Sequence, residues 1–433
     1  MKIKKGVLPT LLGILLLTAC TNGPQSPTTD VDPRNKTALE SGEPTELSIY
    51  LWSLSQQEFD YIAELAKTRF PNLTLKAVAP QTSGNSIDEL LTLGTMPDIF
   101  VNRFSTDLKK RDLLVDLEDY IKKYHYDMNR LEPVTLELMK NDANGMVAGI
   151  PLDFAVNALH YNKDIFDKFG LPYPKDGMTW DEVYDLAKQL TRNENGTLYR
   201  GFSDRWMDTF FAQNPFGLSY LAPDEDKAAV NNEGWRKVAE NWKRFYAFPG
   251  LQFDAKTINK EEDRKVFQKG TSAMTVWAMN MQDWNFNWDV VSMPTYAEKE
   301  GIGAPASVRY LYITKSSKNK DVAFQFAAWL THDEVQTALA KNKGFLTVLK
   351  NPEIQKAYRQ NDEIYRGKHV SSFYFNKYPA VAAARKPGLV TIDAQSLFIK
   401  ELEKAVLQGT DLNTVLRSAE ESINQAIQTE KSK

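Results

Sequence analysis

The sequence predicts an α/β protein in which helices cover a largely parallel sheet. The order of the predicted elements supports this fold class, and the length of the chain predicts more than one domain. From Glu46 onward, short runs of alternating apolar residues, typical of strands, are separated by segments whose apolar residues recur at helical spacing. The chain also has 433 residues, of which 42% are hydrophobic. Because one hydrophobic core rarely serves a chain this long, we expect two or three domains.

The first folded elements follow one another as strand, helix, strand, helix, strand. Alternating apolar residues predict strands at 46–52, 73–79 and 96–101. Helices are predicted at 56–70 and 86–94. The first helix carries an apolar stripe at Phe59, Ile62, Ala63, Ala66 and Phe70. This order of elements is typical of a layered α/β domain.

The same alternation continues through the rest of the chain. The apolar stretch 147–162, interrupted by Pro151 and Asp153, predicts a strand, a crossing and another strand. Thr179 and Glu182 have the spacing of a capping box, which starts a helix. Further strands are expected at 272–278, 290–294 and 311–315. Further helices are expected at 235–246, at 261–268, after an Asn319 N-cap, at 396–409 ending on Gly409, and at 411–427.

The first 44 residues predict export and attachment to lipid. A basic start precedes an apolar run too short to span a bilayer, which is typical of a signal peptide, here 1–19. Leu17-Thr18-Ala19-Cys20 resembles the bacterial lipobox, whose cysteine thiol carries a diacylglyceryl group, so Cys20 is the predicted lipidation site. The alternative is an ordinary signal peptide with an incidental cysteine. Residues 20–44, rich in Pro, Thr and Ser, predict a flexible tether.

The sequence contains no recognisable motif for catalysis or cofactor binding. It lacks G-x-S-x-G, a phosphate-binding loop, H-E-x-x-H and G-x-G-x-x-G, and its four histidines lack ligand spacing, so we expect no metal and no cofactor. A net charge of −3 without blocks of like charge argues against nucleic acid as a partner. A carboxylate pair for glycoside hydrolysis stays open, because 56 acidic residues offer many pairs and the sequence singles out none.

Residues 150–190 carry a specific resemblance. Its pieces are Ile150-Pro151, Leu159-His160-Tyr161-Asn162-Lys163-Asp164, Gly170-Leu171-Pro172, Pro174 and Thr179-Trp180-Asp181-Glu182. This stretch is similar to the signature region of family 1 extracellular solute-binding proteins, the sugar-type receptors of ABC importers and relatives of maltose-binding protein. The segments 267–278 and 313–336 and the C-terminal helical region agree with the same family in order and spacing.

The resemblance implies a two-lobe, periplasmic-binding-protein-like fold, each lobe a sheet flanked by helices, with the ligand cleft between the lobes. By position, the chain should cross between lobes near Phe154–Asn157, Gly303–Ala306 and Lys343–Leu349. The N-terminal lobe would then comprise 45–154 and 306–346, and the C-terminal lobe 155–305 and 347–433.

The function that the resemblance implies is capture of a carbohydrate, an oligosaccharide, by hinge closure and its delivery to the membrane subunits of an ABC transporter. The receptor would act as a monomer, held by lipid on the outer side of the cell membrane. The long tether favours a Gram-positive surface over a periplasm. Two alternatives stay open: a surface-anchored glycoside hydrolase and a signalling lipoprotein that presents ligand to a sensor.

Candidate ligand contacts are aromatic and polar residues near strand ends and crossings, because sugars offer apolar faces and a rim of hydroxyls. The candidates are Trp52, Asn102, Arg103, Asp153, Asp204, Trp206, Trp277, Asn280, Arg309, Tyr310 and Tyr374. Trp277 is the preferred one, because relatives place ligand contacts after the corresponding strand, although the loop here lacks the glycine often found there. Trp52 could instead fill the core, Asp153 could serve as a hinge or capping carboxylate, and Tyr374 could pack helices.

Overall fold

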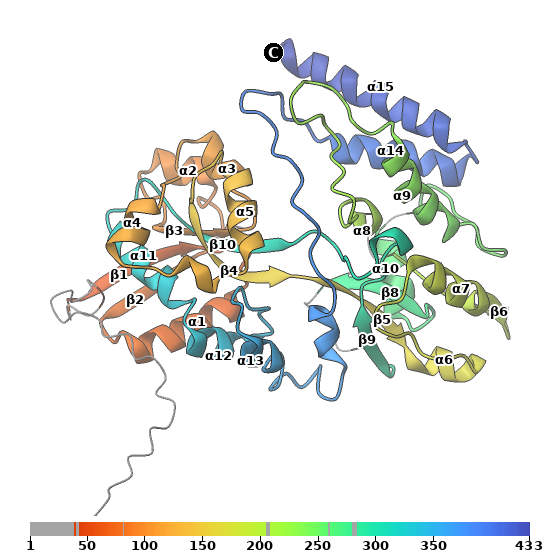
Figure 1. The fold of residues 1–433 in the computed structure, drawn as a ribbon, viewed down its shortest axis with the longest axis horizontal. Coiled ribbons are helices and arrows are strands. Elements are labelled where there is room, and N and C mark those ends of the chain that lie inside the picture. Colours follow the sequence, from red (N-terminus) through yellow and green to blue (C-terminus); the bar gives the residue numbers. More distant parts are fainter. Residues whose placement is uncertain (1–38, 40–42, 81, 205–207, 259, 279–283) are drawn as a thin grey trace, which may run out of the picture.

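The computed structural model describes residues 39, 43–80, 82–204, 208–258, 260–278 and 284–433. Figure 1 shows two lobes side by side, each built from a sheet and surrounding helices. The two-lobe α/β class predicted from the sequence is thereby confirmed. The predicted signal peptide, Cys20 and nearly all of the tether lie outside the described residues, as do Trp206 and Asn280.

The N-terminal lobe contains a five-stranded sheet in the order β2-β1-β3-β10-β4. Its strands are β1 (Thr45–Tyr50), β2 (Leu73–Val78), β3 (Ile99–Asn102), β4 (Gly149–Ala155) and β10 (Ser307–Ile313). Strands β2 and β3 both pair in parallel with β1, as predicted, whereas β10 is antiparallel to both β3 and β4. Two strands that are both antiparallel to β10 run in the same direction, so β4 is parallel to β3.

Helices cover both faces of this sheet. They are α1 (Gln56–Arg69), α2 (Ile87–Thr92), α3 (Thr106–Lys110), α4 (Glu118–Lys123), η2 (Met128–Arg130), α5 (Pro133–Asp142), α11 (Lys320–Trp329) and α12 (Asp333–Lys343). The short helix α13 (Pro352–Lys356) follows α12 and contacts both α12 and η4. Successive strand residues point to opposite faces, so Leu47 and Ile49 join the core beneath α1 and α11, whereas Tyr50 joins the other core. Helix α1 begins where the sequence requires it, because Ser55 and Glu58 form a capping box.

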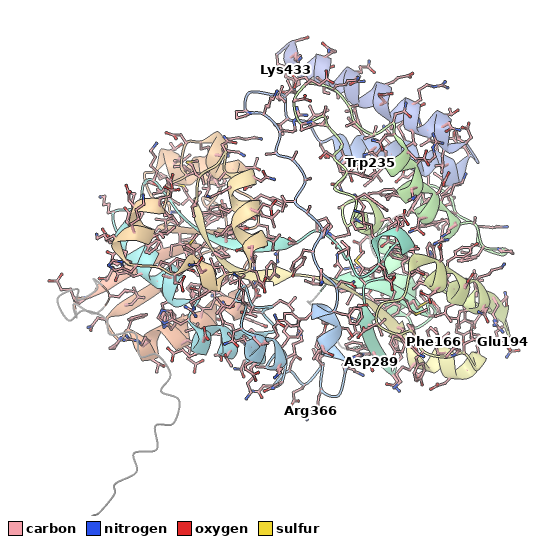
Figure 2. The ribbon with its side chains drawn as sticks, in the orientation of Figure 1. Phe166, Glu194, Trp235, Asp289, Arg366 and Lys433 are labelled. Carbon is pink, nitrogen blue, oxygen red and sulfur yellow. The ribbon has the colours of Figure 1, made fainter. Side chains whose placement is uncertain are left out.

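The C-terminal lobe contains a three-stranded sheet in the order β8-β5-β9 and a separate hairpin. The strands are β5 (Asn157–Asn162), β6 (Arg192–Glu194), β7 (Thr197–Tyr199), β8 (Met274–Ala278) and β9 (Trp288–Ser292). The helices are α6 (Lys163–Phe169), α7 (Trp180–Leu190), α8 (Asp208–Phe211), α9 (Glu233–Arg244), α10 (Lys260–Gln268), η3 (Ala297–Lys299), η4 (Val370–Tyr374), α14 (Ala394–Leu407) and α15 (Leu412–Lys431). Trp235 of α9, labelled in Figure 2, packs against Phe398 of α14 with ring centroids 4.8 Å apart.

The chain passes between the two sheets at three places that meet near the centre of the molecule. Only Val156 separates β4 from β5, which belong to different sheets. The second connection leads from β9 to β10, and the third follows α12, after which η4 packs against β9. Val156 and Gly303 of the first two connections line a small pocket of ≈ 20 Å³ with Phe373 of η4. The third connection meets the first where the backbone N–H of Phe154 donates to the carbonyl oxygen of Leu346 at 2.9 Å. A hinge at this point would therefore involve every connection at once.

The strand, crossing and strand predicted for 147–162 are confirmed as β4, Val156 and β5, and Pro151 and Asp153 lie inside β4. Strand β4 is at the edge of its sheet, where a proline without an N–H is tolerated. Asn319 occupies the N-cap of α11 without capping it, because its side-chain amide donates to the Glu46 carbonyl oxygen at 3.2 Å. The three-stranded sheet of the C-terminal lobe is antiparallel.

Candidate functional site

The direction of the strands defines which edges of the two sheets face each other. Strand β4 runs parallel to β1, β2 and β3, and its carboxyl end leads directly into the other lobe. The residues that follow β1, β2 and β3 therefore lie at the edge from which the chain crosses. In the C-terminal lobe, β8 and β9 are antiparallel to β5, so their carboxyl ends return toward the same crossing. Ligand sites of α/β proteins commonly lie at such carboxyl ends.

Trp52 lies two residues beyond β1, and 49% of its surface is exposed. Its ring stacks over Phe100 and Tyr50, with centroids 6.4 Å and 6.2 Å away. Those two rings stack on each other at 4.8 Å, so the exposed indole rests on a buried aromatic base. Trp52 also lines a pocket of ≈ 340 Å³ together with Ser53, Ser55, Gln56, Ala79 and Pro80. An indole held this way presents one apolar face to a ligand.

Asn102 and Arg103 lie at the same edge as Trp52. Asn102 ends β3 and is buried, and its Oδ1 accepts the backbone N–H of Arg103 at 2.8 Å. The half-buried guanidinium of Arg103 donates to the carbonyl oxygen of Ser307 at 3.4 Å. Burial lowers the pKa of Arg103, and the neighbouring charge of Arg309 lowers it further, while Asp153 and Glu58 oppose the shift. Arg103 thus places a partly desolvated cation near the crossing.

Asp153 and Arg309 are brought together by the pairing of β4 with β10. The guanidinium of Arg309 donates to both carboxylate oxygens of Asp153, at 2.6 Å and 2.8 Å, and to Glu58 of α1 at 3.0 Å. It also donates to the carbonyl oxygen of Ser53, beside Trp52, at 2.8 Å. Burial alone would lower the pKa of Arg309, but the carboxylates of Asp153 and Glu58 have the larger effect and raise it.

This buried ion network joins the two strands of the crossing to the loop that carries Trp52. Asp153 is fully buried and Arg309 is 4% exposed, and within the described residues their charges are satisfied by each other, by Glu58 and by Ser53. The geometry favours the hinge carboxylate among the alternatives for Asp153. Direct ligand contact by Asp153 or Arg309 stays a prediction.

In the C-terminal lobe, Trp277 and Asp204 lie at the edge that faces the crossing. Trp277 is the penultimate residue of β8 and is 4% exposed, with its ring edge-on to Trp284 at 5.8 Å. Asp204 is buried on a segment that runs beside β8, because the backbone N–H of Ser203 donates to the Met274 carbonyl at 3.0 Å. Both residues occupy the predicted side of the lobe, and their contact with ligand stays a prediction.

Tyr310 and Tyr374 have partners inside the protein. The Tyr310 hydroxyl donates to the carbonyl oxygen of Thr135 at 2.7 Å, and the side chain is 3% exposed. The half-buried Tyr374 accepts the backbone N–H of Thr347 at 3.3 Å. These bonds support packing roles, in line with the helix-packing alternative for Tyr374.

Several residues of this edge were not predicted from the sequence. Glu58 was assigned only to a helix, although it completes the ion network. Tyr50 and Phe100 form the base beneath Trp52, and Phe104 is 63% exposed just after Arg103. The aromatic base could have been found from aromatic residues two positions apart at a strand end, because such residues lie on the same face of the sheet.

The facing edges carry side chains suited to binding a small molecule. The described part of the chain holds no group of three or more His, Cys, Asp or Glu side chains placed to bind a metal ion. None of the helices that the structure describes is long and apolar enough to cross a bilayer. What the facing edges offer is an aromatic surface, hydrogen-bonding side chains and a crossing with three connections.

Proteins with similar sequences include binding proteins. A putative binding protein of Brucella abortus strain 2308 is 21% identical over 296 residues, covering 63% of this chain and 68% of that relative. An sn-glycerol-3-phosphate-binding periplasmic protein of Brucella melitensis is 25% identical over 247 residues, covering 52% of this chain and 54% of the relative.

Among solved structures, the ABC substrate-binding protein Lmo0181 of Listeria monocytogenes matches with a TM-score of 0.69 at 20% identity. The match covers 89% of this chain and 99% of that one, so nearly the whole fold is shared. Residues 61–364 match the family model for bacterial extracellular solute-binding proteins. That segment is more than half of the chain and includes strands of both sheets, and the chain therefore belongs to the bacterial extracellular solute-binding proteins.

Proposed function

We propose that this protein captures a carbohydrate, an oligosaccharide, between its lobes and delivers it to the membrane subunits of an ABC importer. The observation that carries the proposal is Trp52, an exposed indole on a stacked aromatic base beside a pocket of ≈ 340 Å³. Sugar rings bury their apolar C–H faces on such surfaces, and their hydroxyls need polar partners. The Listeria neighbour, whose structure was solved in complex with cycloalternan, supports a carbohydrate ligand.

Capture would proceed by hinge closure. A ligand that touches Trp52 on one lobe and Trp277 on the other binds the closed form more tightly, so it shifts the population toward that form. The three connections that meet near Val156 would absorb the change in backbone angles. No bond is made or broken in this cycle, and the protein is proposed to act as a monomer without enzymatic activity.

We also propose the remaining features of the receptor. Cys20 carries the lipid that holds the protein on the outer side of the cell membrane, at a Gram-positive surface, after removal of residues 1–19. The N-terminal lobe comprises 45–154 and 306–346, and the C-terminal lobe 155–305 and 347–433. The memberships of β4, β5 and β10 in their two sheets support this division.

Thermal unfolding with candidate sugars tests the function. Mono- and oligosaccharides are added to the purified protein, and a sugar at 100 times its dissociation constant should stabilise the folded state by about 2.7 kcal/mol. Trp52→Ala should remove most of this shift without lowering the melting temperature of the ligand-free protein, because Trp52 is half exposed. Trp277→Ala should reduce the ligand-induced shift and also lower the melting temperature of the ligand-free protein, because removing this buried side chain opens a cavity in the core.

Prolonged incubation separates a receptor from a hydrolase. The bound sugar should be recovered unchanged after many hours. Release of shorter products would contradict the proposed function, and so would a complete absence of stabilisation across mono- and oligosaccharides.

A further inference from the structure

Glu58, the third residue of helix α1, uses its two carboxylate oxygens for different partners. Oε2 accepts the backbone N–H and the hydroxyl of Ser55, both at 2.7 Å, and these bonds belong to the capping box that starts the helix. Oε1 accepts a bond from the guanidinium of Arg309 on β10 at 3.0 Å. A capping box needs only the first oxygen, so the bond to Arg309 requires a different explanation.

The capping box of α7 provides a comparison. Its glutamate, Glu182, accepts the backbone N–H and the hydroxyl of Thr179 at 2.7 Å and 3.0 Å, nearly the same geometry. Within the part of the chain that the structure describes, Glu182 forms no ion pair, whereas Glu58 forms one with Arg309. The bond to an arginine on a distant strand is therefore not a general feature of the capping boxes in this protein.

Arg309 lies where the three connections between the lobes come together. Strand β10 follows the second connection, and the bidentate bond to Asp153 reaches β4, which leads into the first. At the third connection, the guanidinium lies over the ring of Phe345, 4.6 Å from its centroid. It also donates to the carbonyl oxygen of Ser53 at 2.8 Å. One side chain thus contacts both the proposed hinge and the loop that carries Trp52.

The loop 51–56 is held between these bonds. It supplies most of the lining of the ≈ 340 Å³ pocket, and Glu58 lies outside that lining. In the middle of the loop, Ser53 donates its N–H to the carbonyl oxygen of Val101 at 3.1 Å and accepts a bond from Arg309. At the end of the loop, Ser55 is bound to Glu58, and through Glu58 to the same guanidinium. A loop that is fixed before binding loses less conformational entropy when ligand arrives.

We propose that Glu58 is a positioning residue for ligand binding, which holds the Trp52 loop in a fixed position relative to the hinge through its bond to Arg309. The inference rests on the proposed function, because it concerns the affinity of the same site. Glu58 would raise affinity without contacting ligand. A role confined to capping α1 would instead affect the stability of the fold and leave the affinity unchanged.

Isothermal titration of the full chain in detergent tests the inference with glucose, maltose, maltotriose and maltotetraose. Glu58→Ala should weaken binding of every sugar that the wild type accepts by about three- to tenfold, because the loop must then be ordered on binding. Glu182→Ala removes the matched glutamate from the capping box of α7 and should leave the affinities unchanged. Both variants should lower the melting temperature of the ligand-free protein, since each loses a capping bond.

Amide hydrogen exchange follows the loop without any ligand. In protein carrying isotope-labelled serine, Glu58→Ala should speed exchange at the Ser53 amide, although that N–H donates to Val101 and not to Glu58. Glu182→Ala should leave the rate at Ser53 unchanged. This readout reports the position of the loop itself, which the loss of a helix cap elsewhere does not alter.

Glu58→Gln separates the cap from the bond to Arg309. Glutamine serves in capping boxes, but its single amide oxygen cannot accept bonds from both Ser55 and Arg309 in the geometry of the carboxylate. Weakened sugar binding with a Ser55 amide as protected as in the wild type supports the proposal. Sugar binding at the wild-type level with an unprotected Ser55 amide also supports it, because the bond to Arg309 is then the one retained.

The outcomes that overturn the proposal are distinct from those that contradict the function. Wild-type affinities in Glu58→Ala would overturn it, and so would a Glu58→Gln variant that binds sugar normally with Ser55 still protected. If the wild type bound none of the four sugars, the carbohydrate function would be contradicted. Exchange at Ser53 would then decide the role of Glu58 by itself: a faster rate in Glu58→Ala supports positioning of the loop, and an unchanged rate overturns it.

Discussion

His160 lies in the middle of β5, enclosed by aromatic rings. The centroids of Trp288, Trp284 and Phe373 are 5.6, 5.7 and 6.2 Å from its own, and the side chain is fully buried. Its Nδ1–H donates to the carbonyl oxygen of Ala158 at 3.1 Å. Burial lowers the pKa of His160 to about 3, because a charged imidazole would be poorly solvated there.

This burial predicts a loss of stability in mild acid. The unfolded chain binds a proton at His160 below a pKa of about 6.5, whereas the folded chain stays neutral there until about pH 3. The free energy of unfolding should therefore fall by about 2 kcal/mol between pH 7 and pH 5 on account of this residue. Guanidinium unfolding at the two pH values measures the loss. It should be smaller by that amount in His160→Gln, and an equal loss in both proteins would contradict the assignment.

For individual residues, the sequence predicted the residue types at the site better than it predicted the residues that they contact. Trp52 lies at a strand end as expected, because a strand boundary is visible in the local pattern. The bond from Tyr310 to Thr135 joins residues 175 positions apart, and no local pattern reports such a contact. Asp153 and Arg309 were both selected as polar groups beside predicted crossings, but their pairing depends on the register of β4 with β10.

Among the elements, β4 and β10 are joined by a buried bidentate contact between Asp153 and Arg309 in addition to their backbone pairing. Asp153→Ala should lower the free energy of unfolding by about 3–5 kcal/mol, because it leaves a buried guanidinium short of its main partner. Chemical unfolding measures the change. The matched control is Glu353→Ala, which removes the exposed ion pair with Lys356 and should cost about 0.5 kcal/mol or less. Similar effects of the two variants would argue against a structural role for the buried pair.

The elements show why local pattern predicts helices and strands but not how strands assemble. Strand β1, helix α1 and strand β2 lie where periodicity placed them, and α7 begins at the predicted Thr179 capping box. Strand β10 was also expected, yet its insertion between β3 and β4 was not. That insertion depends on pairing across more than 150 residues, for which the only signal in the chain was the resemblance to a family.

For the whole molecule, the three connections predict a change of shape when ligand binds. A compact chain of 433 residues has a radius of gyration of roughly 22 Å, and a two-lobe protein with separated lobes exceeds this value. Small-angle X-ray scattering should show the radius decreasing toward that value when a binding sugar is added. Trp52→Ala should need more sugar for the same decrease. An unchanged radius at saturating ligand would contradict closure.

The place of β10 in its sheet has a consequence for how the protein is made. Strands β3 and β4 have no shared partner until residues 307–313 have left the ribosome, so the N-terminal lobe cannot complete its sheet earlier. Long-range strand pairing of this kind folds slowly. Such a delay would suit a secreted chain, because the chain could still pass unfolded through a translocation pore before β10 joins β3 to β4.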